Sequence, residues 1–336
     1  MPSHREAIDL KYRTFGRLGW LVSEIGCGTW GMGGGESGWQ GGSDESANAS
    51  LLRAVELGCN FFDTAWIYGR GHSEKLVGAM AESLQDKRLH IATKIPPKNM
   101  NWPSRRQDRI EDVFPYDHVM AYADRSLANL GLECIDLLQF HVWEDDWADK
   151  EEWQRAVEDL KRQGKIAGVG ISVNTWEPTN VLHTLKTGLI DAVQVIYNVF
   201  EQQPEDDLFP YCKANDIAVV ARVPFDEGSL TGSITRDTRF DESDWRASYF
   251  VEDNLRQCVP RVERIIADLA GSMSLTDFAL RFVLDNPSVS TVIPGMRRTR
   301  HVESNIGVSG LPPLPAGIAE MAKRHRWDRK PTAWSQ

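Results

Sequence analysis

The sequence has no long hydrophobic run. None of its apolar stretches approaches the roughly 18 residues that indicate a membrane-spanning helix. Its first residues, Met1 to Arg13, are polar and of mixed charge, without the apolar centre of a signal peptide. We therefore expect a cytoplasmic protein with no membrane partner.

Cysteine is scarce and dispersed. The five cysteines are odd in number and form no C-x-x-C pair, which disfavours a disulfide framework and a zinc cluster. Positive charge is also in deficit, since the formal net charge is −10 at pH 7. A phosphate backbone selects a basic surface, so nucleic acid is not expected as a partner. The oligomeric state cannot be read from the sequence.

Linkers and low-complexity segments are missing as well, although the chain is 336 residues long. A recurring joint is present instead, in which a helical pattern ends at glycine or asparagine and an apolar run follows. Leu57-Gly58 precedes Phe61-Phe62 in this way, and Gln163-Gly164 precedes Ile166 to Ile171. Glycine favours the left-handed backbone that ends helices. Continuously apolar strands are typical of parallel sheets buried on both faces.

Extending these joints predicts eight strand and helix pairs. Strands are expected near residues 24–28, 60–63, 90–94, 135–140, 166–171, 192–197, 217–222 and 289–293. Helices are expected near 44–57, 73–83, 117–130, 151–163, 176–187, 205–215, 259–269 and 299–306, with another near 274–285. Long segments at 95–116 and 224–258 are expected to be functional loops.

Eight such pairs favour a closed α/β barrel, the (β/α)8 or TIM fold, over an open sheet. No G-x-G-x-x-G motif lies at a turn from strand to helix, so a Rossmann half is not supported. We expect a single domain over residues 10–325, with tails at 1–9 and 326–336. Residues 10–23 are expected to form a hairpin that caps the bottom of the barrel.

Ionisable residues end three of the predicted strands. Asp63 ends the second strand, Tyr68 follows five residues later, Lys94 ends the third strand, and His141 follows the fourth. In such barrels, these ends meet at one mouth. Each residue alone has an ordinary structural explanation, but a lysine buried beside an aspartate is costly without a function.

Together these four side chains can protonate a carbonyl oxygen. A free tyrosine has a pKa of about 10, too high for efficient proton transfer near neutrality. We expect Lys94 to lower the pKa of Tyr68, Asp63 to hold Lys94, and His141 to orient the substrate oxygen. Because the sequence has neither a metal-ligand cluster nor a covalent nucleophile with its base, a nicotinamide is the expected hydride donor.

At these residues the sequence resembles the aldo-keto reductase superfamily, from about Tyr12 to Asn305. The resemblance is carried by Gly26-Cys27-Gly28-Thr29-Trp30, Phe62-Asp63-Thr64-Ala65 with Tyr68-Gly69, Gly168 to Ser172, and Ile293 to Arg297. It implies a catalytic tetrad of Asp63, Tyr68, Lys94 and His141, with tyrosine as the general acid.

The resemblance also implies where a cofactor binds. Gly28, Thr29, Trp30 and Asp63 match the nicotinamide pocket, and Ser172 and Gln194 match residues that hold the carboxamide. The usual asparagine after that serine is Val173 here, and Arg222 stands where many members have a stacking aromatic residue. In the family a long loop folds over the pyrophosphate. Its beginning is matched here by Pro224, Phe225, Gly228 and Leu230.

A phosphate-binding pattern follows the eighth strand. Gly295, Arg297, His301, Ser304 and Asn305 match the family's site for a 2′-phosphate. Arg297, Arg298 and Arg300 form a positive patch at a helix N-terminus, which favours NADP(H) over NAD(H). As a structural alternative, the arginines could form a solvated face.

Tryptophans near the motifs predict an aromatic substrate pocket. Trp30, Trp66, Trp143 and Trp147 are expected to wall it, with Trp102 as a further candidate. We expect an NADP(H)-dependent reductase that converts a small aldehyde, ketone or sugar to an alcohol. Two alternatives stay open: a low-turnover, cofactor-binding regulatory subunit of the same fold, and a barrel lyase or isomerase that uses Lys94 as a Schiff base.

Overall fold

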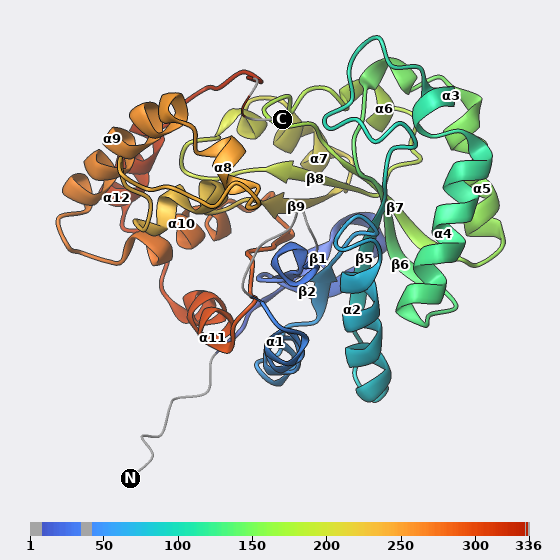
Figure 1. The fold of residues 1–336 in the computed structure, drawn as a ribbon, viewed down its shortest axis with the longest axis horizontal. Helices are drawn as coiled ribbons and strands as arrows, with labels where there is room; N and C mark the ends of the chain where they lie inside the picture. Colours follow the sequence, from blue (N-terminus) through green and yellow to red (C-terminus); the bar gives the residue numbers. More distant parts are fainter. Residues whose placement is uncertain (1–8, 35–41, 333, 335–336) are drawn as a thin grey trace.

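The centre of the molecule is a parallel sheet whose strands follow one another in chain order (Figure 1). The computed structural model describes residues 9–34, 42–332 and 334, and this part of the chain contains an eight-stranded sheet. Its strands are β3 (Cys27–Gly28), β4 (Phe61–Asp63), β5 (His90–Ile95), β6 (Ile135–Phe140), β7 (Ile166–Ser172), β8 (Ala192–Ile196), β9 (Ala218–Arg222) and β10 (Thr291–Val292). The sheet closes on itself through parallel bridges from Ile25 to Val292 and from Gly28 to Gly295. The predicted (β/α)8 architecture is confirmed.

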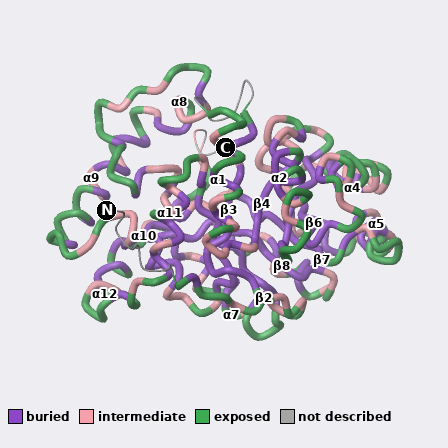
Figure 2. Tube along the Cα trace, turned by 90° about the horizontal axis from the view of Figure 1, so that it is seen from below, coloured by how far each residue is buried: buried purple, intermediate pink, exposed green. Residues whose placement is uncertain are grey.

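Helices surround the sheet and bury its outer face. They are α1 (Asp44–Glu56), α2 (His72–Ser83), α3 (Ile110–Val113), α4 (Tyr116–Leu130), α5 (Glu151–Arg162), α6 (Leu182–Leu185), α7 (Leu208–Ala214), α8 (Arg246–Tyr249), α9 (Glu252–Leu269), α10 (Leu275–Leu284), α11 (Thr299–Gly307) and α12 (Ala316–Arg324). Figure 2 shows the buried residues concentrated along the central strands and the exposed ones on the outer helices. Among the described residues, no helix is long and apolar enough to span a bilayer.

Strand side chains alternate between two cores, as the twofold period of a strand requires. Phe62 and Leu138 belong to the large core under the helices, whereas Phe61 and Leu137 belong to a smaller core inside the barrel. The antiparallel hairpin of β1 (Tyr12–Phe15) and β2 (Trp20–Ser23) completes this inner core. Phe15 is fully buried there, with its ring centroid 5.3 Å from that of Phe61. The predicted bottom hairpin is confirmed.

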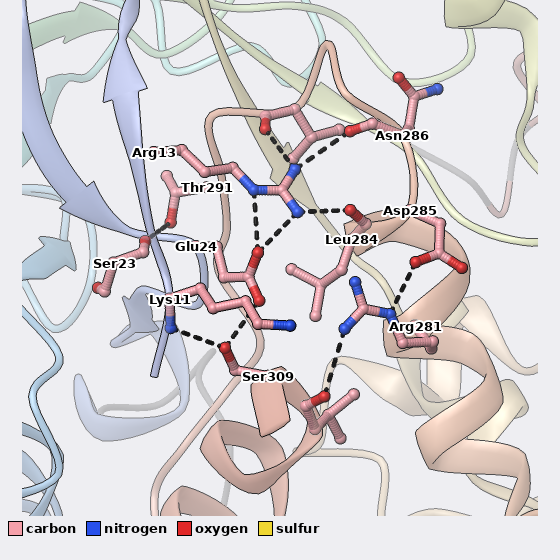
Figure 3. A network of polar contacts seen from close by, with 12 residues as sticks. Lys11, Arg13, Ser23, Glu24, Arg281, Leu284, Asp285, Asn286, Thr291 and Ser309 are labelled. Carbon is pink, nitrogen blue, oxygen red and sulfur yellow. Dashed lines mark hydrogen bonds and ion pairs between the residues drawn. The ribbon is translucent and has the colours of Figure 1, made fainter. Parts of the chain in front are cut away.

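Arg13 on β1 holds the seam where the short strands β3 and β10 meet (Figure 3). Its guanidinium pairs with the buried carboxylate of Glu24 and donates to carbonyl oxygens of Leu284, Asn286 and Val289. The Glu24 carboxylate also accepts from Ser309 Oγ at 2.7 Å. Charged groups therefore supply contacts at a seam that is poor in strand pairing.

Several helices differ from the sequence prediction, and the short helices α3 and α8 lie in segments that were predicted as loops. The helix expected at 176–187 is reduced to α6, because Pro178 disfavours helical backbone and Trp176 has a left-handed φ of 58°. Helix α9 begins at Glu252 rather than near 259 and contains Pro260. The sequence pattern did not indicate α12.

The C-terminal segment after α12 is packed rather than extended. Residues 326–332 lie in the predicted tail, yet Trp327 donates its backbone N–H to Phe200 O at 2.8 Å and the side chain of Arg329 is buried. Trp334 packs edge-on against Trp176, in the loop after β7, and against Tyr249 at the end of α8. The predicted tail residues 1–8, 333, 335 and 336 lie outside the described residues.

Candidate active site

The carboxyl ends of three neighbouring strands bring the predicted tetrad together. Asp63 is the last residue of β4, Lys94 lies near the end of β5, and His141 directly follows β6. Tyr68 lies in the loop between β4 and α2, where its N–H donates to Ala65 O and its C=O accepts from Ser73 N. Parallel pairing puts these strand ends at one face of the barrel.

Lys94 is the centre of the cluster. Its ammonium donates to Asp63 Oδ2 at 2.5 Å, to Thr64 O at 2.9 Å and to the Tyr68 hydroxyl at 3.2 Å. The Lys94 side chain is fully buried, and that of Asp63 is 3% exposed. An ammonium has three hydrogens, so all of its donors are used by the protein. A lysine tied up in this way is not poised to attack a carbonyl as an amine.

Two glutamines fix the other oxygen of Asp63. Oδ1 accepts from Gln194 Nε2 at 2.7 Å and from Gln139 Nε2 at 3.2 Å. Both glutamines are buried. Gln194 was predicted as a carboxamide contact, while Gln139 was not singled out. Its signal in the sequence is one amide within the otherwise apolar end of β6, since such a side chain needs a buried partner.

His141 packs against two aromatic rings, those of Tyr68 and Trp102. Its ring centroid is 5.8 Å from that of Tyr68 and 4.6 Å from that of Trp102, both edge to face. Burial holds the pKa of His141 well below its usual value, and the nearby Lys94 and Arg222 lower it further. The ring is therefore neutral near pH 7. Its buried Nδ1 has no hydrogen-bond partner among the described residues, which leaves it available to a ligand.

The pKa of Tyr68 is raised, not lowered as the sequence predicted. Burial raises it most, and the attraction of Lys94 opposes this without overcoming it, while Asp63 raises it further. The lysine thus acts in the expected direction, but desolvation of the phenolate is the larger effect. Tyr68 consequently keeps its proton through the neutral range.

The predicted tryptophan wall divides into two groups. Trp30 lies at the site, with its ring centroid 6.3 Å from Tyr68, whereas Trp66 packs edge-on against Tyr122 of α4. Trp143 and Trp147 are buried to 3% exposure or less in the core under the helices. Their indole N–H groups donate to Thr184 Oγ1 and Asp108 O. Their assignment to the substrate pocket is therefore corrected, because they fill the space between loop and helix.

Two other tryptophans extend this aromatic surface, one beside His141 and one beside Trp30. Trp102 contacts His141, as described, and Trp245 from the loop before α8 packs against Trp30 at 4.7 Å between centroids. Trp245 was not predicted, because it lies 215 positions from Trp30 and no local spacing relates them. Trp30, Trp102 and Trp245, which we call the aromatic rim, are each incompletely buried.

Residues predicted to hold a nicotinamide lie on three neighbouring strands, with Ser172 at the end of β7, Gln194 in the middle of β8 and Arg222 at the end of β9. Ser172 pairs in register with Gln194, and Val173 N donates to Gln194 O. Arg222 ends β9 and donates through Nη2 to Val173 O at 2.9 Å. Its buried Nε has no hydrogen-bond partner among the described residues. This polar atom, like Nδ1 of His141, can bind a ligand group at the barrel mouth.

Thr29 and Gly28 have roles in the barrel itself. Thr29 Oγ1 donates to Asp63 O at 2.9 Å and lies 2.7 Å from Ser73 Oγ, so its hydroxyl ties β3 to β4 and α2. A Cβ at Gly28 would lie 2.7 Å from Ile293 O, so only glycine permits the closing contact with the chain that follows β10. The sequence pattern did not separate these structural roles from cofactor binding.

The predicted pyrophosphate loop is a tight turn after β9. Pro224 and Leu230 are buried, while Phe225 and Gly228 are partly exposed. Gly228 has a φ of 110°, and a Cβ there would meet open space. The turn η5 (Asp226–Thr231) also carries left-handed backbone at Asp226 and Glu227, with φ of 47° and 56°.

A positive cluster forms at the start of α11. Burial lowers the pKa of Arg297, and the nearby charges of Arg298 and Arg246 lower it further, although Asp244, the ionic partner of Arg246, opposes them. Burial and Arg300 likewise lower the pKa of His301. Asn305 is buried, Ser304 is exposed, and a Cβ at Gly295 would meet open space. Converging cations at a helix N-terminus fit an anionic phosphate.

Comparisons with solved structures show the same fold. An aldo-keto reductase from Bacillus halodurans in its holo form aligns with a TM-score of 0.76 at 22% identity, covering 97% of this chain and 100% of that one. A glycerol dehydrogenase from Gluconobacter oxydans aligns with a TM-score of 0.74 at 27% identity, covering 94% of each chain.

Comparisons of sequence agree with this fold. Aldo-keto reductase YhdN of Bacillus subtilis is 28% identical over 313 residues, covering 90% of this chain and 89% of the relative. An NADH-specific methylglyoxal reductase of Escherichia coli is 26% identical and covers 86% of this chain and 90% of its own length. The model of the aldo/keto reductase family matches residues 24–324. The chain therefore belongs to the aldo/keto reductase family, whose members are oxidoreductases.

Proposed function

We propose that the protein reduces the carbonyl group of a small aldehyde, ketone or sugar to an alcohol with NADPH, and that Tyr68 donates the proton. The observation that carries this proposal is the buried contact of Lys94 with both the Asp63 carboxylate and the Tyr68 hydroxyl. A buried ion pair contributes little net stability, because removing both charges from water is costly, so its presence at a strand end favours a role in the reaction.

Each residue of the tetrad has a role that follows from its charge state. Tyr68 enters the reaction protonated, because burial raises its pKa. When the carbonyl oxygen gains negative charge, that oxygen takes the phenolic proton and leaves a tyrosinate. Lys94, 3.2 Å from the phenolic oxygen, stabilises the tyrosinate, and Asp63 keeps the ammonium in place. Neutral His141 can orient the carbonyl oxygen by donating a hydrogen bond from its ring.

The residues present fit a nicotinamide dinucleotide. Unpartnered buried nitrogens on His141 and Arg222 lie at the barrel mouth, and the positive cluster at α11 lies after β10. Ser172, Gln194 and Arg222 would hold the nicotinamide end, and the turn η5 would receive the pyrophosphate. The bound cofactor supplies the hydride, which the protein has no group to provide.

NADP(H) is the preferred form in this proposal because of Arg297, Arg298 and Arg300. Several guanidinium groups favour a 2′-phosphate, whereas a 2′-hydroxyl offers no charge to them. Relatives of both kinds exist, since one from Schizosaccharomyces pombe is named with NADP(+) and the Escherichia coli relative is NADH-specific. The preference is therefore a property to measure on this chain.

Consumption of NADPH with a reactive aromatic aldehyde tests the proposal, with NADH used in parallel. Wild-type protein is expected to consume NADPH, and Tyr68→Phe to lose turnover while keeping NADPH affinity, since only the hydroxyl is removed. General acid catalysis contributes about 10²- to 10⁴-fold, so the loss has to be at least 100-fold. Tight NADPH binding with negligible wild-type turnover across a panel of carbonyl compounds would favour the regulatory alternative instead.

A further inference from the structure

The turn proposed to receive the pyrophosphate contains two consecutive acidic residues. Asp226 and Glu227 begin η5, and each has a left-handed φ, at 47° and 56°. Non-glycine residues rarely adopt this backbone, and the strain persists only where surrounding contacts hold it. A pyrophosphate is strongly anionic, so free carboxylates in this turn would oppose its binding. The turn needs both a counter-charge and an anchor.

Arg329 supplies both to Asp226. Its Nη2 lies 2.7 Å from Asp226 Oδ1, and each side chain is only 3% exposed. The other carboxylate oxygen of Asp226 accepts from Ser229 Oγ at 2.8 Å. The ion pair is thus shielded from solvent, and shielded charges attract each other more strongly than charges at the surface. It joins the turn to a segment 103 residues later in the chain.

Aromatic rings and backbone contacts hold Arg329 in place. Its guanidinium lies 4.4 Å from the ring centroid of Trp176 and 4.8 Å from that of Trp327. Gln203 Nε2 donates to Arg329 O at 3.3 Å, and the neighbouring Trp327 N donates to Phe200 O at 2.8 Å. Trp176, Phe200 and Gln203 come from the loops after β7 and β8, and Trp327 from the C-terminal segment itself, so all of these anchors lie outside the turn. Arg329 is therefore positioned independently of Asp226.

A second carboxylate near Arg329 contributes less charge. Glu201 Oε2 is 3.9 Å from Arg329 Nε, beyond hydrogen-bond distance, and the Glu201 side chain is 1% exposed. Burial raises the pKa of Glu201 to about 7, although Arg329 attracts its charged form. Asp226 is consequently the close ionic partner of Arg329.

We propose that Arg329 is a positioning residue for cofactor binding: it cancels the charge of Asp226 and pins η5 in the conformation that admits a pyrophosphate. This inference rests on the proposed function. It assigns the C-terminal segment 326–332 to the cofactor site, although the segment follows the last helix and reaches no member of the tetrad.

Four variants separate charge cancellation from general packing. Arg329→Met removes the counter-charge, Asp226→Asn removes the carboxylate, the double variant removes both, and Arg329→Lys keeps the charge. Arg326→Met is the matched control, because Arg326 lies in the same segment but pairs with Asp206 and Asp328. The probe is NADPH itself, with its dissociation constant measured by quenching of tryptophan fluorescence, and thermal unfolding is recorded for every variant.

Arg329→Met is expected to weaken NADPH binding at least about tenfold, because it leaves a buried carboxylate beside the anionic cofactor. The double variant and Asp226→Asn should bind within about threefold of wild type or more tightly, since the opposing charge is gone. Arg329→Lys should recover most of the affinity, and Arg326→Met should change it less than about twofold. Single-turnover hydride transfer at saturating NADPH should be unchanged in Arg329→Met.

Equal NADPH affinity of Arg329→Met and wild type would overturn the inference and leave the proposed function intact. Loss of affinity in the double variant as large as in Arg329→Met would also overturn it, because packing and not charge would then explain the effect. If Arg329→Met does not fold, the same decision rests on Asp226→Asn, whose tenfold weakening would contradict charge cancellation. Wild-type protein that binds neither NADPH nor NADH would overturn the proposed function together with the inference.

Discussion

The ammonium group of Lys94 lies between two oxygens, 2.5 Å from Asp63 Oδ2 and 3.2 Å from the Tyr68 hydroxyl. The buried ammonium therefore contacts both a carboxylate, Asp63, and a hydroxyl, Tyr68, which becomes negatively charged only when it releases its proton. Because the carboxylate already balances the ammonium, formation of a tyrosinate adds a charge that the site must stabilise through the same lysine.

Replacing Lys94 by Met is expected to affect turnover and stability separately. Turnover should fall at least about 100-fold, because the tyrosinate loses its stabilising charge. Stability should fall by about 3–5 kcal/mol, because Asp63 is left as an unpaired buried carboxylate. Single-turnover oxidation of NADPH and urea unfolding measure the two effects. The double variant Asp63→Asn/Lys94→Met should regain stability without regaining turnover, and recovery of turnover would contradict the role of Lys94.

The affinity for NADPH should weaken as the pH rises through about 7, because Glu227 titrates there. Burial raises the pKa of Glu227 to about 7 against the attraction of Arg222, with Asp226 raising it further and Arg329 lowering it. Below this pH the side chain is neutral, and above it a negative charge lies within the turn that is proposed to receive the pyrophosphate. We expect a weakening of at least about threefold between pH 6 and pH 8. Glu227→Gln should flatten the profile, and an unchanged slope in this variant would assign the dependence to another group.

Arg297→Ala is expected to weaken NADPH binding much more than NADH binding. A charged hydrogen bond to a phosphate contributes about 1.5–3 kcal/mol, which corresponds to a loss of roughly 10- to 100-fold for NADPH alone. Dissociation constants for both cofactors are compared in wild type, in Arg297→Ala and in the control Arg256→Ala, whose side chain forms an exposed pair with Asp253. An equal loss for both cofactors would show that Arg297 does not read the 2′-phosphate.

Trp102 and Trp143 should respond differently to replacement by alanine. Trp102 lies 4.6 Å from His141 at the aromatic rim, so Trp102→Ala should reduce kcat/KM for an aromatic aldehyde about tenfold. Trp143 is fully buried, so Trp143→Ala should cost about 3–5 kcal/mol of stability. Steady-state kinetics and thermal unfolding are measured on both variants. A specific kinetic defect in Trp143→Phe with full stability would return Trp143 to the substrate pocket.

Arg13→Met should destabilise the barrel by about 3 kcal/mol without changing cofactor affinity. The substitution leaves the buried Glu24 without its cation and three carbonyl oxygens without their donor. Arg256→Met is the control, since Arg256 and Asp253 form an exposed pair that contributes less than about 1 kcal/mol. Equal stability of the two variants in urea would show that the seam does not depend on Arg13.

Repetition in the sequence was sufficient to predict the barrel. Apolar runs that begin after helix-ending glycines, such as Gly58 and Gly164, are local signals, and both glycines have the expected left-handed backbone. Parallel closure then brings together any residues at the carboxyl ends of strands, so Asp63, Lys94 and His141 could be predicted to meet. Where local rules conflicted, as around Pro178, the predicted helix was too long, because only α6 forms in that segment.

By itself, then, the sequence determined the order of strands and the meeting of the tetrad, because both follow from period and position along the chain. Only the tertiary structure decided which tryptophans form the aromatic rim. Trp143 is buried in the core under the helices, while Trp245 comes from a distant loop and packs against Trp30. The tertiary structure also decided the raised pKa of Tyr68 and the pairing of Asp226 with Arg329. Burial and long-range partners set both, and neither is encoded in local spacing.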